Sequence, residues 1–179
     1  MSVNTLDMKL DDDDFALFDL PRKFEQQRAD IDQRWKALQS EVHPDRFVAE
    51  GAAAQRLAMQ WAVRVNEAHR RLRDPLARAA YLCELLGAPI NAENNTAMPS
   101  GFLMEQMQWR EALDDAADLA EVQALDGQVQ DREVALQASI RTLLDDQGDA
   151  AAAAAQVRAL MFVTRFREDI NRRLERLEP

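Results

Sequence analysis

Apolar side chains recur at helical spacing along most of this sequence, and this pattern restricts the fold more than any other feature. The segment about 27–42 carries apolar residues at i, i+4, i+7 and i+11, namely Ile31, Trp35, Leu38 and Val42. The segment about 52–72 repeats the pattern with Leu57, Trp61, Val65, Ala68 and Leu72. Only five glycines are present and β-branched residues form no sustained run, so strands are not expected. The chain is therefore predicted to be all-α.

Seven helices are expected from this period, and proline, aspartate and glycine mark several of their ends. Pro44 disfavours helical geometry at His43 and ends the second helix there. Asp74 followed by Pro75 supplies an N-cap and a first-turn proline for the fourth helix, and Gly87 ends it. The predicted ranges are about 13–20, 27–42, 52–72, 75–86, 99–117, 118–146 and 150–177.

Two runs of one residue type fall at predicted helix starts. The acidic run DDDD, residues 11–14, is predicted to be a solvated stretch whose charge favours the positive end of the first helix. The alanine run 150–155 has high helix propensity and follows Asp149, a candidate cap. We interpret it as the start of a helix whose backbone packs closely against a neighbour. Gly127 lowers the helix propensity of 118–146 by about 1 kcal/mol relative to alanine.

The stretch GAPINAENNTAMPSG, residues 87–101, is the best candidate for a domain boundary because it concentrates glycine, proline and asparagine. We predict a small helical domain over 13–86, a linker over 87–98 and a three-helix bundle over 99–179. Each predicted domain carries its own apolar stripes, so the two are expected to fold separately.

The net charge is acidic, and most of it lies in the second half of the chain. There are 22 Lys and Arg against 32 Asp and Glu; residues 1–86 contribute 13 − 15 = −2 and residues 87–179 contribute 9 − 17 = −8. Affinity for nucleic acid comes largely from neutralising phosphates, so a nucleic-acid partner is not expected. The single cysteine, Cys83, cannot form an internal disulfide, and we find no apolar N-terminal signal or membrane-length apolar stretch. We therefore expect a cytoplasmic protein that does not enter the membrane.

The segment SEVHPDRFVAE, residues 40–50, sets a His-Pro-Asp (HPD) sequence between two predicted helices and permits four interpretations. A metal site would need several ligands, but His43 and His69 lie on different segments and the cysteine has no CxxC partner. Acid–base catalysis by His43 and Asp45 would need a nucleophile, a Gly-rich phosphate loop or an oxyanion motif, and we find none. A plain turn between helices and a surface that another protein binds both remain open.

The predicted helix 99–117 has two apolar faces. At 100° per residue, one stripe suits a bundle core and contains Phe102, Trp109, Leu113 and Ala116. Nearly opposite lie Leu103, Met104 and Met107. In the last helix, the core stripe is Leu160, Val163, Ile170 and Leu174, and Phe162 lies about 110° away from it. A helix with two apolar faces is either buried in the middle of the bundle or exposes one face to a partner, and the pattern leaves both open.

The sequence around HPD resembles the J domain of J-type co-chaperones, because FALFDLP, WKALQSEVHPDRF and VNEAHRRLRDPLARAAYLCELLG follow in that family's order. The match continues through GFLMEQMQWREALDDA and VRALMFVTRF, which is typical of the HscB family, the J-type co-chaperones of iron–sulfur cluster assembly. The resemblance covers nearly the whole chain. It implies a J domain packed in an L shape against a C-terminal three-helix bundle. The Gly/Phe-rich segment and zinc-binding cysteines of general J co-chaperones are absent, which agrees with a dedicated client.

The resemblance implies a co-chaperone that is not itself an enzyme and needs no metal or cofactor. It would stimulate ATP hydrolysis by a DnaK-class chaperone, HscA, while presenting the iron–sulfur scaffold protein IscU to it. The implied chaperone-binding residues are His43, Pro44, Asp45 and Arg46, with Arg34 and Lys36 on the preceding helix. The implied scaffold-binding residues are Leu103, Met104, Met107, Arg110, Glu111 and Phe162. The alternative is a helical adaptor that holds a partner and acts on no ATPase.

Overall fold

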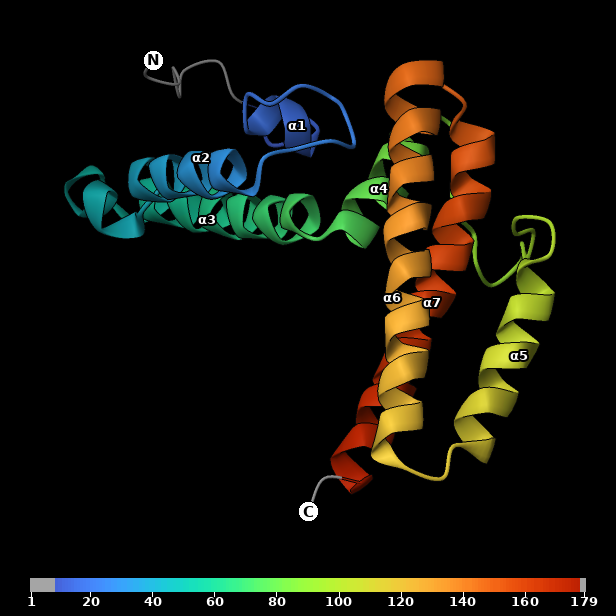
Figure 1. Cartoon of the computed structure of the whole chain (residues 1–179). Helices are drawn as coiled ribbons and strands as arrows, with labels where there is room; N and C mark the ends of the chain where they lie inside the picture. Colours follow the sequence, from blue (N-terminus) through green and yellow to red (C-terminus); the bar gives the residue numbers. More distant parts are fainter. Residues whose placement is uncertain (1–8, 178–179) are drawn as a thin grey trace. The chain divides into compact units, whose positions relative to one another are not determined.

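The computed structural model describes residues 9–177, and every regular element in that range is helical, as predicted (Figure 1). The α-helices are α1 (Asp14–Leu17), α2 (Arg28–Glu41), α3 (Ala52–Arg73), α4 (Pro75–Leu85), α5 (Phe102–Asp115), α6 (Leu119–Arg141) and α7 (Ala150–Leu177). A 3₁₀ helix, η2 (Pro44–Glu50), follows α2, and a π-helical segment, η3 (Thr142–Gln147), follows α6. Contacts divide the chain into two compact units that meet inside α4, between Arg78 and Ala79.

In the first unit α2 and α3 run side by side as an antiparallel hairpin (Figure 1). Its core is formed by apolar side chains of α1, α2 and α3 that are almost completely buried: Phe15, Leu17, Ile31, Leu38, Val65, Ala68 and Leu72. The predicted stripe on α3 is wrong at Leu57, which is 49% exposed. Leu57 and Val65 are eight residues apart, which at 100° per residue places them about 80° apart around the helix. Ala58 takes the buried position instead.

The last two residues of the acidic run have structural roles at the start of α1. The prediction of a solvated stretch is wrong for them, whereas the prediction that the run favours the N-terminal end of this helix is confirmed by Asp13. Asp13 is the N-cap of α1 and accepts hydrogen bonds from the N–H groups of Phe15 and Ala16, both at 3.0 Å. Asp14 is completely buried and pairs with two arginines of α3, Arg64 at 2.7 Å and Arg71 at 3.2 Å. A buried carboxylate requires such partners, because an unpaired one would be strongly destabilising.

Three predicted helix ranges differ from the observed ones at turns with positive φ. The helix predicted at 13–20 stops after four residues, because Asp19 adopts φ 51°. The helix predicted from 99 begins only after Gly101, whose φ is 79°. The helix predicted at 118–146 becomes π-helical after Arg141 and ends at Gly148, whose φ is 67°. L side chains rarely adopt this left-handed region, so the two glycines suit their positions.

In the second unit α6 and α7 pack along each other and α5 completes the bundle (Figure 1). The buried apolar side chains include Phe102, Trp109, Val122, Leu125, Val129, Leu136, Ile140, Val157, Leu160, Val163, Phe166 and Ile170. The prediction for the alanine run is confirmed: α7 begins at Ala150, and Ala153 and Ala154 are buried. Asp149 caps the helix by accepting a hydrogen bond from the N–H of Ala152 at 3.0 Å.

The segment between α4 and α5 is attached to α7 by one arginine. Arg158 is only 6% exposed, and its guanidinium donates to the carbonyl oxygens of Ile90 at 2.8 Å and Ala97 at 2.6 Å. The predicted linker 87–98 is therefore anchored within the second unit. Its backbone satisfies the buried guanidinium, which would otherwise lack acceptors.

Candidate functional site

The HPD sequence forms a rigid turn between α2 and η2. His43 has extended backbone geometry, φ −64° and ψ 127°, as expected for a residue before proline. Pro44 then starts η2, where its missing N–H leaves no bond unmade. The His43 Nδ1 accepts a hydrogen bond from the N–H of Asp45 at 3.3 Å, so the imidazole closes the turn. The short helix η2 was not predicted from the sequence. It has seven residues and 3₁₀ geometry, so its apolar residues do not show the 3.6-residue period by which the other helices were recognised.

The carboxylate of Asp45 is presented to solvent by this turn. Its side chain is 86% exposed, and its Oδ2 lies 3.6 Å from the His43 Nδ1. Arg46 stabilises the turn from the other side, since its Nη1 donates to the carbonyl oxygen of Ser40 at 3.1 Å and its backbone N–H to that of His43 at 3.0 Å. An exposed carboxylate on a fixed backbone is well suited to bind an arginine of another protein through two hydrogen bonds.

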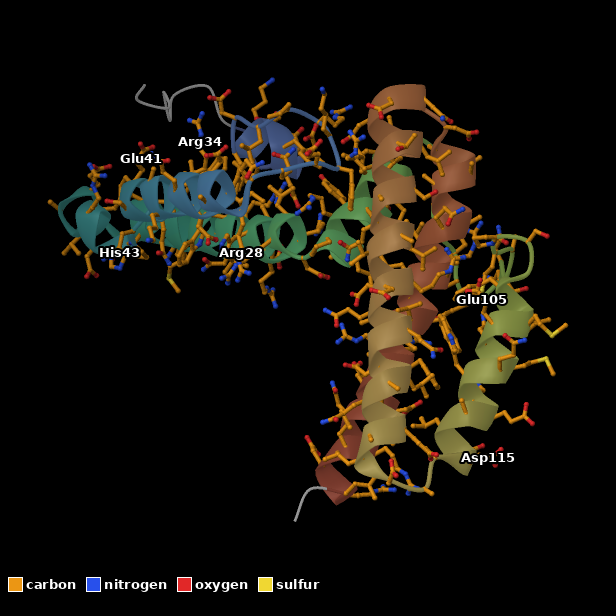
Figure 2. The ribbon with its side chains drawn as sticks, viewed as in Figure 1. Arg28, Arg34, Glu41, His43, Glu105 and Asp115 are labelled. Carbon is orange, nitrogen blue, oxygen red and sulfur yellow. The ribbon has the colours of Figure 1, made fainter. Side chains whose placement is uncertain are left out.

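The surface of α2 carries balanced charge. Arg34 pairs with Asp19 at 3.1 Å, and Glu41 lies on the same side of α2 as Arg34 (Figure 2). Lys36 is exposed. The two basic residues predicted to contact a chaperone are thus both on the surface, but the charge of one of them is already offset within the chain.

A polar cluster joins α2 to α3. The Trp35 indole stacks on the His69 imidazole, with ring centroids 4.4 Å apart, and its Nε1–H donates to Asn66 at 2.9 Å. His69 Nε2 lies 2.8 Å from a carboxylate oxygen of Asp32, and this hydrogen bond lowers the pKa of Asp32. The second histidine of the chain therefore braces the hairpin and does not share a site with His43. Asp32 and Trp35 are three residues apart on α2, and Asn66 and His69 are three residues apart on α3. This spacing was the only sequence signal for the cluster.

The described residues offer no metal site, and the cysteine is buried. Among residues 9–177, no group of three His, Cys, Asp or Glu side chains is placed to hold a metal ion. Burial raises the pKa of the Cys83 thiol to about 11, so the thiol is protonated and unreactive at neutral pH. No helix in the same range combines the length and apolarity needed to cross a membrane.

One face of α5 exposes a cluster of large apolar side chains. Leu103, Met104 and Met107 are 69%, 61% and 60% exposed, respectively. Figure 2 shows the side chains of α5 that end in sulfur pointing away from α6 and α7. The opposite face is buried through Phe102 and Trp109, as the wheel predicted. The interpretation of α5 as a helix buried in the middle of the bundle is therefore wrong, and its second apolar face is open to a partner.

The edge of this apolar face is formed by Arg110 and Phe162. The guanidinium of Arg110 lies over the Phe162 ring, 5.5 Å from its centroid. The Phe162 ring also stacks on Phe166 and meets Phe102 edge-on, each at 5.8 Å between centroids. Phe162 is therefore half-buried and joins the bundle core to the surface. Glu111, the remaining residue of the predicted set, is exposed on α5.

A helical hairpin with an HPD turn, followed by a C-terminal helical unit, is the arrangement that the resemblance to J-type co-chaperones predicts. The model of the HSCB C-terminal oligomerisation domain matches residues 98–171. A co-chaperone protein HscB homolog of Burkholderia multivorans is 50% identical over 174 residues, covering 96% of this chain and 99% of that protein. The homolog of Burkholderia vietnamiensis is 49% identical over the same length.

Two solved structures agree with these relatives. The chaperone HscB from Vibrio cholerae superposes with a TM-score of 0.81 at 33% identity, covering 93% of this chain and 100% of that one. Human co-chaperone protein HscB gives a TM-score of 0.84 at 26% identity, covering 92% of this chain and 83% of that one. The chain belongs to the HscB co-chaperone family.

Proposed function

We propose that this protein binds an IscU-type iron–sulfur scaffold protein through α5, delivers it to the DnaK-class chaperone HscA and stimulates that chaperone's ATPase. The chain would carry out no hydrolysis of its own. The observation that carries the proposal is the presence of two differently built exposed surfaces, a charged turn at one unit and an apolar helix face at the other. Each surface has the chemistry that its proposed partner requires.

The HPD turn supplies the contact to the chaperone. His43 and Pro44 fix the backbone, so little conformational entropy is lost when Asp45 binds. We propose that the Asp45 carboxylate accepts two hydrogen bonds from a chaperone arginine, and that Arg46, Arg34 and Lys36 add contacts around it. Binding at this point would favour the chaperone conformation that hydrolyses ATP, because a ligand shifts an equilibrium by its differential affinity for the two states.

The α5 face supplies the contact to the scaffold. Leu103, Met104 and Met107 would form the apolar centre of the interface, where methionine side chains adapt readily to a partner surface. Arg110, Glu111 and Phe162 would form its edge. Burying these side chains removes apolar surface from water, which contributes about 25 cal/mol per Å² before the entropy of association is subtracted.

A helical adaptor that binds the scaffold but acts on no ATPase is the alternative, and one experiment separates the two. The single-turnover rate of ATP hydrolysis by a DnaK-class chaperone would be measured with the protein alone, with the scaffold alone and with both. We expect stimulation by the protein alone and a larger rate with both. Scaffold binding without any rise in the rate would leave only the adaptor.

A further inference from the structure

A pocket of about 520 Å³ in the C-terminal unit adjoins the α5 face. Its floor and apolar wall come from α7, through Met161, Phe162 and Phe166, and Met98 closes one side. Arginines from two helices line it: Arg110 of α5, and Arg158, Arg165 and Arg172 of α7. Two carboxylates, Glu168 and Asp169, share this lining. Four basic against two acidic groups give the pocket a net charge of 4 − 2 = +2, whereas residues 87–179 as a whole carry −8.

Three of these arginines have no carboxylate partner within the described residues. Arg158 is buried and donates to two carbonyl oxygens, which leave its positive charge uncompensated. Arg110 lies over the Phe162 ring. Arg165 is exposed and makes no ion pair among residues 9–177, whereas Arg172 is paired with Asp169. A pocket that sets uncompensated guanidinium groups beside an apolar wall attracts an anion, because the low-dielectric wall reduces screening.

We propose that this pocket is a carboxylate-binding subsite that receives an aspartate or glutamate side chain of the scaffold docked on α5. The inference rests on the proposed function and extends it from an apolar contact to a charged one. Continuity supports it, since Arg110 and Phe162 belong both to the pocket lining and to the edge of the α5 face. A scaffold that covers Leu103, Met104 and Met107 therefore reaches the opening of the pocket.

The lining of the pocket favours a side chain of a protein client as the occupant. The methylene groups of a glutamate would lie along Met161 and Phe166, and its carboxylate would meet Arg165, whose planar guanidinium binds carboxylates through paired hydrogen bonds. Such a contact would select among clients, because a neutral or basic residue at the same position would leave the guanidinium groups desolvated without a partner.

Arg165→Gln tests the proposal with Arg176→Gln as the matched control. Both arginines are exposed on α7 and both substitutions remove one positive charge, but Arg176 lies outside this pocket. Scaffold affinity would be measured by titration calorimetry at salt concentrations from about 50 to about 300 mM. We expect Arg165→Gln to weaken binding roughly tenfold at the lowest salt and less as salt rises. Arg165→Lys should keep the salt dependence and recover only part of the affinity.

A scan of the scaffold's own carboxylates identifies the partner group. One Asp→Asn or Glu→Gln substitution in the scaffold should weaken binding to the wild-type protein but not to Arg165→Gln, as a double-mutant cycle requires for interacting groups. Equal affinities of Arg165→Gln and Arg176→Gln would overturn the subsite while leaving α5 as the scaffold surface. Succinate that binds the wild-type pocket while Arg165→Gln retains full scaffold affinity would also overturn it. A wild-type protein that does not bind the scaffold at all would refute the proposed function itself.

Discussion

Combined alanine substitution of Leu103, Met104 and Met107 should abolish tight scaffold binding and leave the fold intact. The three side chains are 60% to 69% exposed, so most of their apolar surface is already in water in the folded state. Truncating such residues changes the free energy of unfolding by about 0.5 kcal/mol or less each. Three truncations in a packed core would instead destabilise the bundle by several kcal/mol apiece.

The expected loss of affinity follows from the same three side chains. Side chains that dominate an interface contribute about 2 kcal/mol or more on truncation, with imperfect additivity. Three such side chains give a total of about 6 kcal/mol, and even half of this total corresponds to a roughly hundredfold or larger increase in Kd. Titration calorimetry with the scaffold measures this directly. Stimulation of the chaperone ATPase without scaffold should stay at the wild-type rate, because the HPD turn belongs to the other unit.

Phe162→Ala is the informative comparison for the triple variant. The ring is half-buried, stacks on Phe166 and meets Phe102 edge-on, so its removal should lower the free energy of unfolding by about 2 kcal/mol. For a domain of roughly 100 residues this lowers the Tm by about 10 °C, whereas the triple variant, which loses at most about 1.5 kcal/mol in total, should melt less than about 7 °C below the wild type. A triple variant that melts as early as Phe162→Ala would show that the three side chains are packed in solution. A folded triple variant with wild-type affinity would place the scaffold elsewhere.

Three further predictions concern the turn, the domain boundary and the polar cluster. Asp45→Ala should abolish ATPase stimulation and change the free energy of unfolding by less than about 1 kcal/mol, and retained stimulation or early melting would contradict its proposed role. A fragment of residues 75–179 should fold alone, whereas 99–179 should be less stable by roughly 1–3 kcal/mol, because it lacks the carbonyl acceptors of the buried arginine of α7; equal denaturation midpoints would refute this. The hydrogen bond from His69 lowers the pKa of Asp32, so the stability it contributes is present above the usual carboxylate pKa and is lost as the pH falls through the lowered value. Between about pH 5 and pH 2.5, Asp32→Asn should therefore lose less stability than the wild type, and parallel curves would exclude the contribution.

The helical architecture could be predicted from the sequence because apolar spacing and end signals agree. Pro44 and Pro75 fixed two boundaries that the structure reproduces, with α2 ending at Glu41 and α4 starting at Pro75. That α5 has two apolar faces also followed from the wheel, since Phe102 and Leu103 are 100° apart. What the pattern left open was whether a neighbouring element covers the second face, which depends on packing rather than on period.

The features that were missed depend on contacts between residues far apart in the chain. The burial of Asp14 requires two arginines that lie about 50 residues later in the chain. Asp11 and Asp12 belong to the same acidic run but are not buried, so the local sequence does not distinguish them from Asp14. The anchoring of residues 87–98 requires Arg158, which in isolation is one more arginine on an amphipathic helix. Charge composition indicated an acidic second half and gave no sign that four arginines converge on one pocket.

In the proposed function, the charge on α2 would determine how strongly the chaperone is attracted over a distance. This helix carries three basic and three acidic side chains: Arg28, Arg34, Lys36, Asp30, Asp32 and Glu41. Since Arg34 is also paired with Asp19, a surface with no net charge contributes little to the long-range steering of a charged partner. The contact proposed for Asp45 acts at short range and with fixed geometry, so it is less sensitive to screening.

Scaffold binding should therefore depend more steeply on salt than chaperone stimulation does. The pocket beside α5 holds arginines without carboxylate partners, and their attraction for an acidic client is reduced as the Debye length shortens from about 14 Å near 50 mM salt to about 6 Å near 300 mM. The proposed ATPase stimulation would instead rely on a turn whose neighbouring helix has no net charge to screen. Measuring the scaffold Kd and the half-maximal concentration for ATPase stimulation over this range tests the difference. Equal salt dependences would show that α2 recruits the chaperone electrostatically despite its balanced charge.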